Sequence, residues 1–308
     1  MTLFPYLRPL PEAPPHFFII DIGDLITGDD RLGQAGVIRD AYIEVERGRI
    51  KSVRESRTMP RQLREAIAGR SVRAISAEGA TVSPGLIQSH AHLSQMFWRG
   101  RGEGKQLLPW LADHTWPGEA ALGNDAEAIA VSALYGACEM IRYGATTVVD
   151  MATVHGIEAY VRDGLHPTGL RVYTGPVVMD YMDPEVPFPA LLNETGPAAI
   201  ERTRRAIKFI KALRGTGGRV HPAVTMRFLI TSAPETAHGL AQLALEEDCI
   251  LQTHASEQEA EVGAIRARFA AYNASGRRWH GEPFLTDNVA LLHQLGFLGP
   301  HTFLHHCI

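Results

Sequence analysis

Two histidines separated by one residue, His90 and His92, follow an apolar run at residues 82–87. In an extended strand, side chains two residues apart point to the same side, so both imidazoles can face one point. Imidazole nitrogens are ligands that divalent metals of the zinc type prefer. Two hydrogen-bonded histidines in a turn would give the same pattern, so a metal site needs further ligands from elsewhere in the chain.

Further candidate residues follow two later apolar runs. His254 ends the run at residues 249–254 and Glu257 comes three residues later, while His305 and His306 lie in the run at residues 302–308. Because side chains alternate along a strand, we expect only one of the last two histidines to face the interior. Each residue alone has an ordinary explanation, such as a core histidine or, for Glu257, an acidic first helical turn. Their recurrence at the ends of separate strands favours a shared site.

The elements that must position these residues alternate between apolar strands and helices. About six strands are predicted, at residues 82–87, 145–149, 170–178, 220–229, 249–254 and 302–308, and each except the last is followed by a helix. Repeated strand–helix units imply a parallel sheet covered by helices. No strand precedes a glycine-rich nucleotide-binding loop, which disfavours an open sheet. Histidines at the carboxyl ends of separate strands favour a barrel, because the loops at that rim build its active site.

The fold class is therefore α/β, and we expect three parts in the chain. Residues 1–16 are proline-rich and are interpreted as an extended N-terminal arm. Residues 17–82 contain short strands and turns and are predicted to form a small, mostly antiparallel, β-sandwich-like module. Residues 83–308 are predicted to form an incomplete (β/α)8 TIM-type barrel with about six strands present.

Composition narrows the function classes. The chain has 308 residues, of which 45% are hydrophobic and 21% charged, and these proportions are typical of a globular protein. A formal net charge of −4 gives no basic surface for nucleic acid, and no apolar run approaches the length of a membrane span. Three widely spaced cysteines form no disulfide framework, which indicates a reducing, cytoplasmic location.

Five segments of the chain together resemble one superfamily. They are SPGLIQSHAHLSQ, LLPWLADHTWPGEA, RYGATTVVDM, LQTHASEQEAEV and LGFLGPHTFLHHC. With these segments the chain resembles the amidohydrolase superfamily, and within it the cytosine deaminase and triazine hydrolase-like aminohydrolase branch. The resemblance implies one divalent metal, zinc first and iron second, held by His90, His92 and His254. It also implies that Glu257 shuttles a proton to the substrate ring and that His306 orients the water or the substrate.

The resemblance implies hydrolytic deamination of an amino-substituted N-heterocycle, namely a purine, a pyrimidine or an adenosine-type compound. Gln95, Trp98 and Arg227 are candidate contacts to this small-molecule substrate. A triazine or cyclic-amide hydrolase of the same superfamily is the alternative, although a bridging carboxylated lysine has no candidate, because the chain has no lysine in the later predicted strands. A homo-oligomer is compatible with the sequence.

The family completes its metal site with an aspartate after the eighth barrel strand, and no residue here can be matched to it. The chain ends at Ile308 on the sixth predicted strand. We therefore expect a C-terminally truncated form or fragment of a longer hydrolase, for which a non-catalytic product is a further alternative.

Overall fold

A computed structural model describes residues 14–308 except 124, 185 and 216–217. The described residues divide into two compact units, one ending at Leu86 and the other spanning Ile87–Ile308. The predicted N-terminal arm lies almost entirely outside the described residues. Within them, no helix has the length and apolar character that a membrane crossing requires.

The smaller unit is a single five-stranded sheet with mixed pairing. Its strands run in the order β3-β2-β1-β4, with β5 also paired to β1; their bounds are β1 (His16–Ile26), β2 (Val37–Glu46), β3 (Arg49–Glu55), β4 (Ala74–Ser76) and β5 (Thr81–Val82). β1, β2 and β3 form an antiparallel meander, whereas β4 and β5 run parallel to β1. A short η1 turn (Ser56–Thr58) and helix α1 (Arg61–Ala68) join β3 to β4. Ile22, Leu25, Ala41 and Ile43 form the core of this unit.

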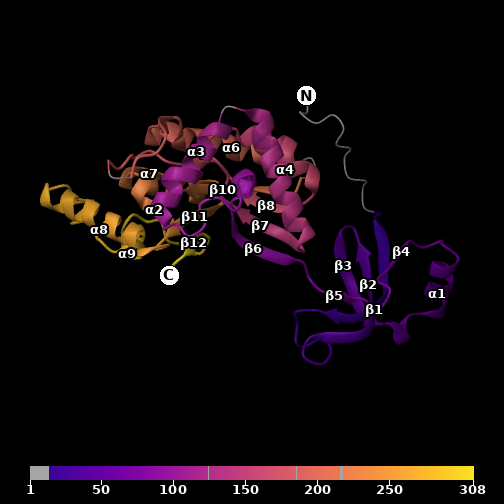
Figure 1. Cartoon of the computed structure of the whole chain (residues 1–308). Helices are drawn as coiled ribbons and strands as arrows, with labels where there is room; N and C mark the ends of the chain where they lie inside the picture. The colour runs from indigo at the N-terminus through magenta and orange to yellow at the C-terminus, as the bar shows by residue number, and fades with distance from the viewer. Residues whose placement is uncertain (1–13, 124, 185, 216–217) are drawn as a thin grey trace. The chain divides into compact units, whose positions relative to one another are not determined.

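The larger unit is built on a parallel sheet in the order β12-β11-β10-β8-β7-β6, with β9 also paired to β10 (Figure 1). The strands are β6 (Leu86–Ala91), β7 (Ala145–Asp150), β8 (Arg171–Thr174), β9 (Val177–Val178), β10 (Val220–Met226), β11 (Ile250–Ala255) and β12 (Thr302–His306). Five spacings across a flat six-stranded sheet would separate its edges by about 24 Å. Yet His90 on β6 and His305 on β12 stack with ring centroids 4.1 Å apart. The sheet is therefore rolled into an incomplete barrel, as the sequence predicted.

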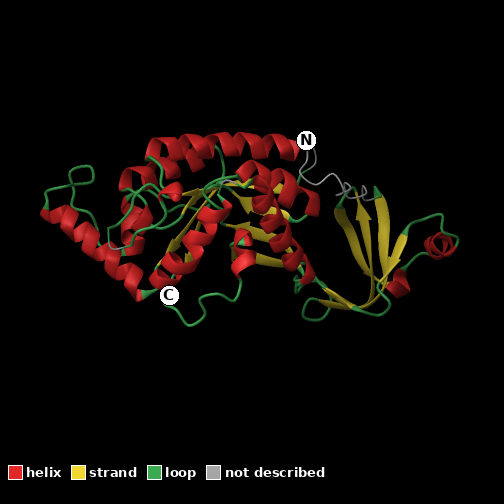
Figure 2. Ribbon diagram, turned by 45° about the horizontal axis from the view of Figure 1, so that its top comes forward, coloured by secondary structure: helices red, strands yellow, loops and turns green. Residues whose placement is uncertain are grey.

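Helices lie on the outside of the rolled sheet (Figure 2). They are α4 (Ala126–Arg142), α6 (Gly196–Gly215), α7 (Pro234–Glu246), α8 (Glu259–Ala274) and α9 (Asn288–Gln294), with the shorter α2 (Leu107–Trp110), α3 (Trp116–Leu122) and α5 (Ile157–Ala159). Asp125 caps α4 by accepting a hydrogen bond from the Ala128 N–H, because an aspartate side chain satisfies an otherwise unpaired donor of the first turn. Two large apolar clusters fill the space between the helices and the sheet.

One predicted strand is two strands in the structure. Residues 170–178 form β8 and β9, separated at Gly175 and Pro176. Pro176 has no N–H to donate to the sheet, and a Cβ on Gly175 would lie 2.0 Å from the Ala223 carbonyl oxygen. The close approach of the β10 backbone therefore requires glycine at this break.

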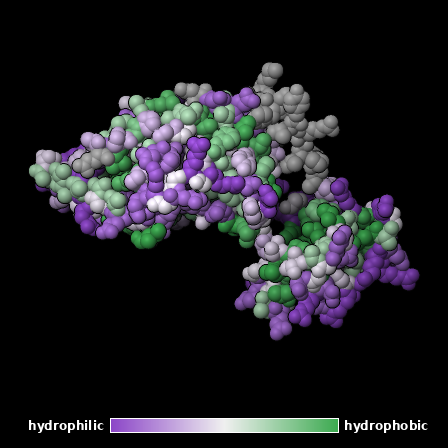
Figure 3. Space-filling model, in the orientation of Figure 1, coloured by the Kyte–Doolittle hydropathy of each residue, from purple (hydrophilic) through white to green (hydrophobic). Residues whose placement is uncertain are grey.

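The first barrel strand also differs from the prediction. The sequence predicted a buried strand at residues 82–87, whereas β6 begins at Leu86 and continues to Ala91. Leu86 and Ile87 are 63% and 71% exposed, because β6 is an edge strand among the described residues. Hydrophobic and hydrophilic side chains are interspersed over the visible face of the larger unit (Figure 3).

The connection after β6 contains a π-helical turn directly before α3. The chain passes through a 3-10 turn, η2 (Leu93–Trp98), then α2, and then the π turn η3 (Leu111–Thr115). Pro117 cannot donate the next hydrogen bond of a regular helix, and the Trp116 N–H bonds instead to the Leu111 carbonyl, five residues back. This register carries the fully buried Trp116 and Glu119 into the interior.

Candidate metal centre

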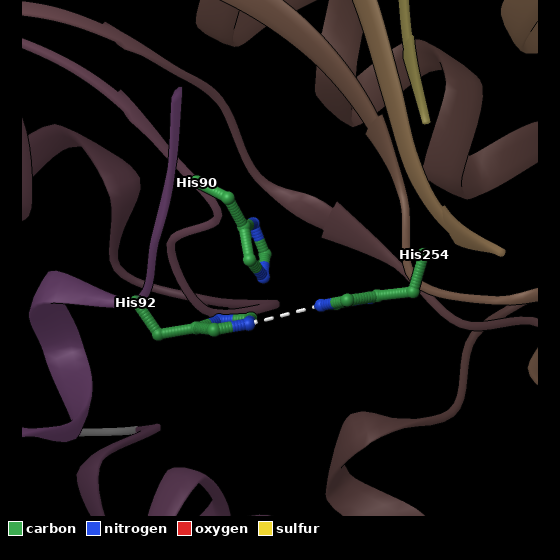
Figure 4. A group of neighbouring side chains, drawn as sticks. All are labelled: His90, His92 and His254. Carbon is green, nitrogen blue, oxygen red and sulfur yellow. Dashed lines mark hydrogen bonds between the residues drawn. The ribbon is translucent and has the colours of Figure 1, made fainter. Parts of the chain in front are cut away.

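Three histidines from two segments far apart in the chain converge at the carboxyl ends of β6 and β11 (Figure 4). The Nε2 atoms of His92 and His254 lie 3.0 Å apart. The His90 ring meets both other rings edge-on, with centroids 5.1 Å from His92 and 5.0 Å from His254. One ring nitrogen from each of the three histidines can be chosen so that the three nitrogens all lie within 4.8 Å of one another.

Backbone carbonyls fix the tautomers of two of these rings. His92 Nδ1 lies 3.1 Å from the Met151 carbonyl oxygen, and His254 Nδ1 lies 2.8 Å from the Arg227 carbonyl oxygen. A carbonyl can only accept, so Nδ1 carries the proton in both rings and Nε2 presents its lone pair. Burial holds the pKa of both imidazoles well below the usual range, so neither ring gains a second proton near neutral pH.

Two lone pairs facing each other at 3.0 Å repel unless a cation lies between them. Two imidazoles bound tetrahedrally to zinc, at about 2.0–2.1 Å, have their nitrogens about 3.3 Å apart. The observed separation is close to this value, and the bonds to Met151 and Arg227 are the supporting contacts expected for metal-binding histidines. The residues present therefore fit a divalent metal.

His90 is the third ligand candidate and is held by stacking. Its ring packs on that of His305, and burial together with the neighbouring histidines lowers the pKa of His90 to about 3. His305 itself is hydrogen-bonded to Gln252. Gln252 uses its amide nitrogen on the Asp150 carbonyl and the Thr225 hydroxyl, so its amide oxygen accepts from His305 Nε2 at 3.0 Å. The hydrogen bond to Gln252 fixes the His305 ring, and the His90 ring stacks on it.

Of the last histidine pair, His305 is buried and His306 is exposed, yet both rings contact the cluster. The His306 ring stacks on His254 with centroids 5.4 Å apart, while His305 contacts His90. His306 has a φ of +73°, so the chain leaves the extended conformation there and side-chain alternation ends. Both rings consequently lie against the cluster.

Glu257 lies beside His306 at the rim of the cluster. The Glu257 Oε2 atom is 3.5 Å from His306 Nε2. One carboxylate oxygen of Glu257 and one nitrogen each of His254 and His306 all lie within 4.8 Å of one another. Burial, with a contribution from the nearby carboxylate of Glu261, raises the pKa of Glu257 to about 7. A carboxyl group with this pKa can both hold and release a proton near neutral pH.

A buried ion pair that sequence reasoning missed adjoins the centre. Glu119 and Arg227 are 0% and 1% exposed, and Arg227 Nη1 donates to both Glu119 oxygens at 2.8 and 2.6 Å. Gln95 Nε2 also donates to Glu119 Oε1 at 3.1 Å. The structure therefore brings Gln95 and Arg227 together through Glu119, whereas Trp98 packs at the edge of an apolar cluster and on Gly118. The LLPWLADHTWPGEA segment contains two acidic residues, Asp113 and Glu119, and nothing in their spacing indicated that Glu119 is the buried one.

Asp150 is a second buried carboxylate that the sequence marked only as the end of a strand. It accepts from the Leu93 N–H at 2.9 Å, the Tyr160 hydroxyl at 2.9 Å and the Thr174 hydroxyl at 2.7 Å. Burial nevertheless raises its pKa to about 6. Because Leu93 follows His92 directly, these bonds fix the backbone that carries the second ligand candidate.

The fold and the site together define a class: an α/β-barrel protein with a cluster of histidines, able to hold a divalent metal, at the carboxyl ends of its strands. A model of the Amidohydrolase family matches residues 81–307, and the chain belongs to that family. The sequence-based assignment to the amidohydrolase superfamily is thereby confirmed.

The chain is also similar to named deaminases. It is 31% identical over 284 residues to the 5'-deoxyadenosine deaminase of Methanothermobacter thermautotrophicus, covering 92% of this chain and 57% of that protein. It is 30% identical to the 5-methylthioadenosine/S-adenosylhomocysteine deaminase of Syntrophobacter fumaroxidans, over 78% of this chain and 48% of that protein. The crystal structure of guanine deaminase from C. acetobutylicum with bound guanine aligns with a TM-score of 0.76 at 26% identity, covering 95% of this chain and 62% of that one. The chain thus spans about half the length of the curated relatives it matches.

Proposed function

We propose that this protein is a divalent-metal-dependent aminohydrolase that removes the amino group of an N-heterocycle by hydrolysis, with an adenosine-type purine as the first candidate substrate. The observation that carries the proposal is the convergence of the His92 and His254 lone pairs beside a carboxyl group, Glu257, whose pKa is about 7. The two lone pairs can bind a metal that activates water, and the carboxyl group can transfer a proton. Hydrolytic deamination requires both.

We infer that His90, His92 and His254 hold the metal, with zinc as the first candidate and iron as the second. Neutral imidazoles add no negative charge, so the cation keeps its full acidity. A divalent metal supplies hydroxide at neutral pH by lowering the pKa of water towards about 7.

The proposed role of Glu257 is to move a proton. Its protonated carboxyl is populated near pH 7 and can donate to a ring nitrogen as hydroxide adds to the amino-bearing carbon. The resulting carboxylate can then take the proton of the added hydroxyl and pass it to the amino group, which leaves as ammonia while the hydroxyl becomes a carbonyl, and the carboxyl regains its proton from solvent. His306 lies within 3.5 Å of the Glu257 carboxyl and is proposed to orient the attacking water or the substrate.

We propose that Gln95, Trp98 and Arg227 contact the substrate. Arg227 uses Nη1 on Glu119, but its buried Nε has no hydrogen-bond partner within the described part of the chain and can donate to a polar group of the substrate. An adenosine-type substrate stands first because two relatives of this chain are named as deaminases of adenosine derivatives, and a guanine-type substrate stands second. The same names give a triazine or cyclic-amide hydrolase less support. The cytoplasmic location and the homo-oligomer stay predictions.

The test combines metal analysis with ammonia release from 5'-deoxyadenosine, guanine, cytosine and melamine. We expect one bound divalent metal per chain and turnover of a purine. Glu257→Gln should lower kcat by about 10²–10⁴-fold with unchanged metal content, because it removes the acid but keeps the side-chain size. Glu259→Gln changes an exposed glutamate two residues away and is the matched control. Full metal occupancy with no ammonia release from any of the four compounds would favour a non-catalytic protein.

A further inference from the structure

The position of Glu257 is not the one that strand geometry gives it. Glu257 follows His254 by three residues, and in an extended strand residues an odd number apart point to opposite faces. In the structure the Glu257 carboxylate instead lies with His254 and His306 on one side. The change of face occurs at Ser256, whose φ is +53°. A left-handed turn at a residue other than glycine is strained, so something must stabilise it.

Glu261 supplies that stabilisation from inside the first turn of α8. Its side chain is fully buried, and Oε2 accepts from the Glu257 N–H at 2.7 Å while Oε1 accepts from Asn288 Nδ2 at 2.9 Å. The backbone N–H groups of Ser256 and Gln258 also stabilise the Glu261 carboxylate. One buried side chain therefore binds the N–H group of the strained residue and those of the two residues that follow it.

We propose that Glu261 is a positioning residue, which holds the left-handed turn at Ser256 so that the Glu257 carboxyl reaches His306 and the metal centre. The proposal rests on the proposed function for its kinetic consequence, but not for the geometry of the turn. Without the carboxylate of Glu261, the turn loses its acceptor and Glu257 moves off the proton-transfer position. A misplacement of about 1 Å can reduce turnover about 100-fold.

The experiment compares the wild-type chain with three variants. Glu261→Ala should lower kcat by about 10–100-fold with KM within about threefold and metal content unchanged, because substrate and metal binding use other residues. Adding Ser256→Gly to Glu261→Ala should recover at least threefold of the lost kcat, since glycine adopts a positive φ without strain. Glu259→Ala removes an exposed carboxylate of the same turn and should match the wild type.

Amide hydrogen exchange gives a readout that does not depend on activity. The Glu257 amide should exchange at least tenfold faster in Glu261→Ala than in the wild type, because its acceptor is gone. If the wild type released no ammonia, the proposed function would fail, and this exchange measurement would still decide the present inference.

The inference is overturned if Glu261→Ala keeps its kcat and its exchange rate within twofold of the wild type, or if Glu259→Ala loses as much. It is also overturned if glycine at position 256 recovers nothing. Should Glu261→Ala fail to fold, Glu261→Gln replaces it, because the amide keeps the volume but has one acceptor oxygen in place of two. That variant should lose at least fivefold in kcat, and an unchanged kcat in the folded protein would be decisive against the proposal.

Discussion

Removing one partner of the Glu119–Arg227 pair should destabilise the barrel strongly. In Glu119→Leu, the Arg227 guanidinium stays buried without its counter-charge, and Gln95 loses its acceptor. Breaking a buried pair from one side costs about 3–5 kcal/mol. The larger unit has about 220 residues, so its unfolding entropy is about 0.47 kcal/mol/K and Tm should fall by about 6–11 °C.

The assay is a double-mutant cycle followed by thermal unfolding at fixed metal concentration. Glu119→Leu and Arg227→Met should each be destabilising, whereas the double variant should lose less than either, because no buried charge is left unpaired. The exposed pair Glu235–Arg277, with atoms 2.6 Å apart, is the control and should contribute less than about 1 kcal/mol. A Tm of Glu119→Leu within 2 °C of the wild type, or losses that simply add in the double variant, would refute the reasoning.

Other predictions concern the metal centre and its support. His92→Ala should weaken metal binding by about 100-fold or more, as measured by competition with a chelator, whereas the exposed His301→Ala should not. Chelation of a metal present at 1,000 times its Kd should remove about 4 kcal/mol of stability, or about 9 °C in Tm, and an unchanged Tm would argue against the site. In the metal-free protein, His90 should contribute a loss of stability as pH falls below 6.5. The unfolded chain then binds a proton at His90 that the folded chain, with its pKa of about 3, does not, which costs about 2 kcal/mol by pH 5. The raised pKa values of Glu257 and Asp150 act in the opposite direction, so the measurement is the difference between the wild type and His90→Asn in urea unfolding, and two variants that change equally between pH 7 and pH 5 would contradict this. Asp150→Ala should cost about 2–4 kcal/mol and also weaken metal binding, because Leu93 loses the acceptor that fixes the backbone beside His92.

Much of the architecture followed from local pattern. The alternation of predicted strands, such as the one at residues 145–149, with helices predicted a parallel barrel, and the structure confirms it with β7 at Ala145–Asp150. Errors occurred where a neighbouring strand decided the outcome. The break at Gly175 and Pro176 is enforced by the Ala223 carbonyl, and Leu86 and Ile87 are exposed because their strand is at an edge. A local window of sequence shows neither which backbone approaches Gly175 nor that β6 lies at an edge of the sheet.

For the site, the sequence by itself determined the chemistry of the groups: imidazoles at strand ends and a glutamate three residues after His254. These are properties of residue type and short spacing. Only the tertiary structure decided which nitrogen His92 and His254 present, because the carbonyls that set their tautomers belong to Met151 and Arg227, which follow β7 and β10. It also decided the pairing of Glu119 with Arg227 across 108 residues and the face on which Glu257 lies. Charge compensation, burial and protonation depend on which groups the fold brings together, and this information is spread over the whole chain.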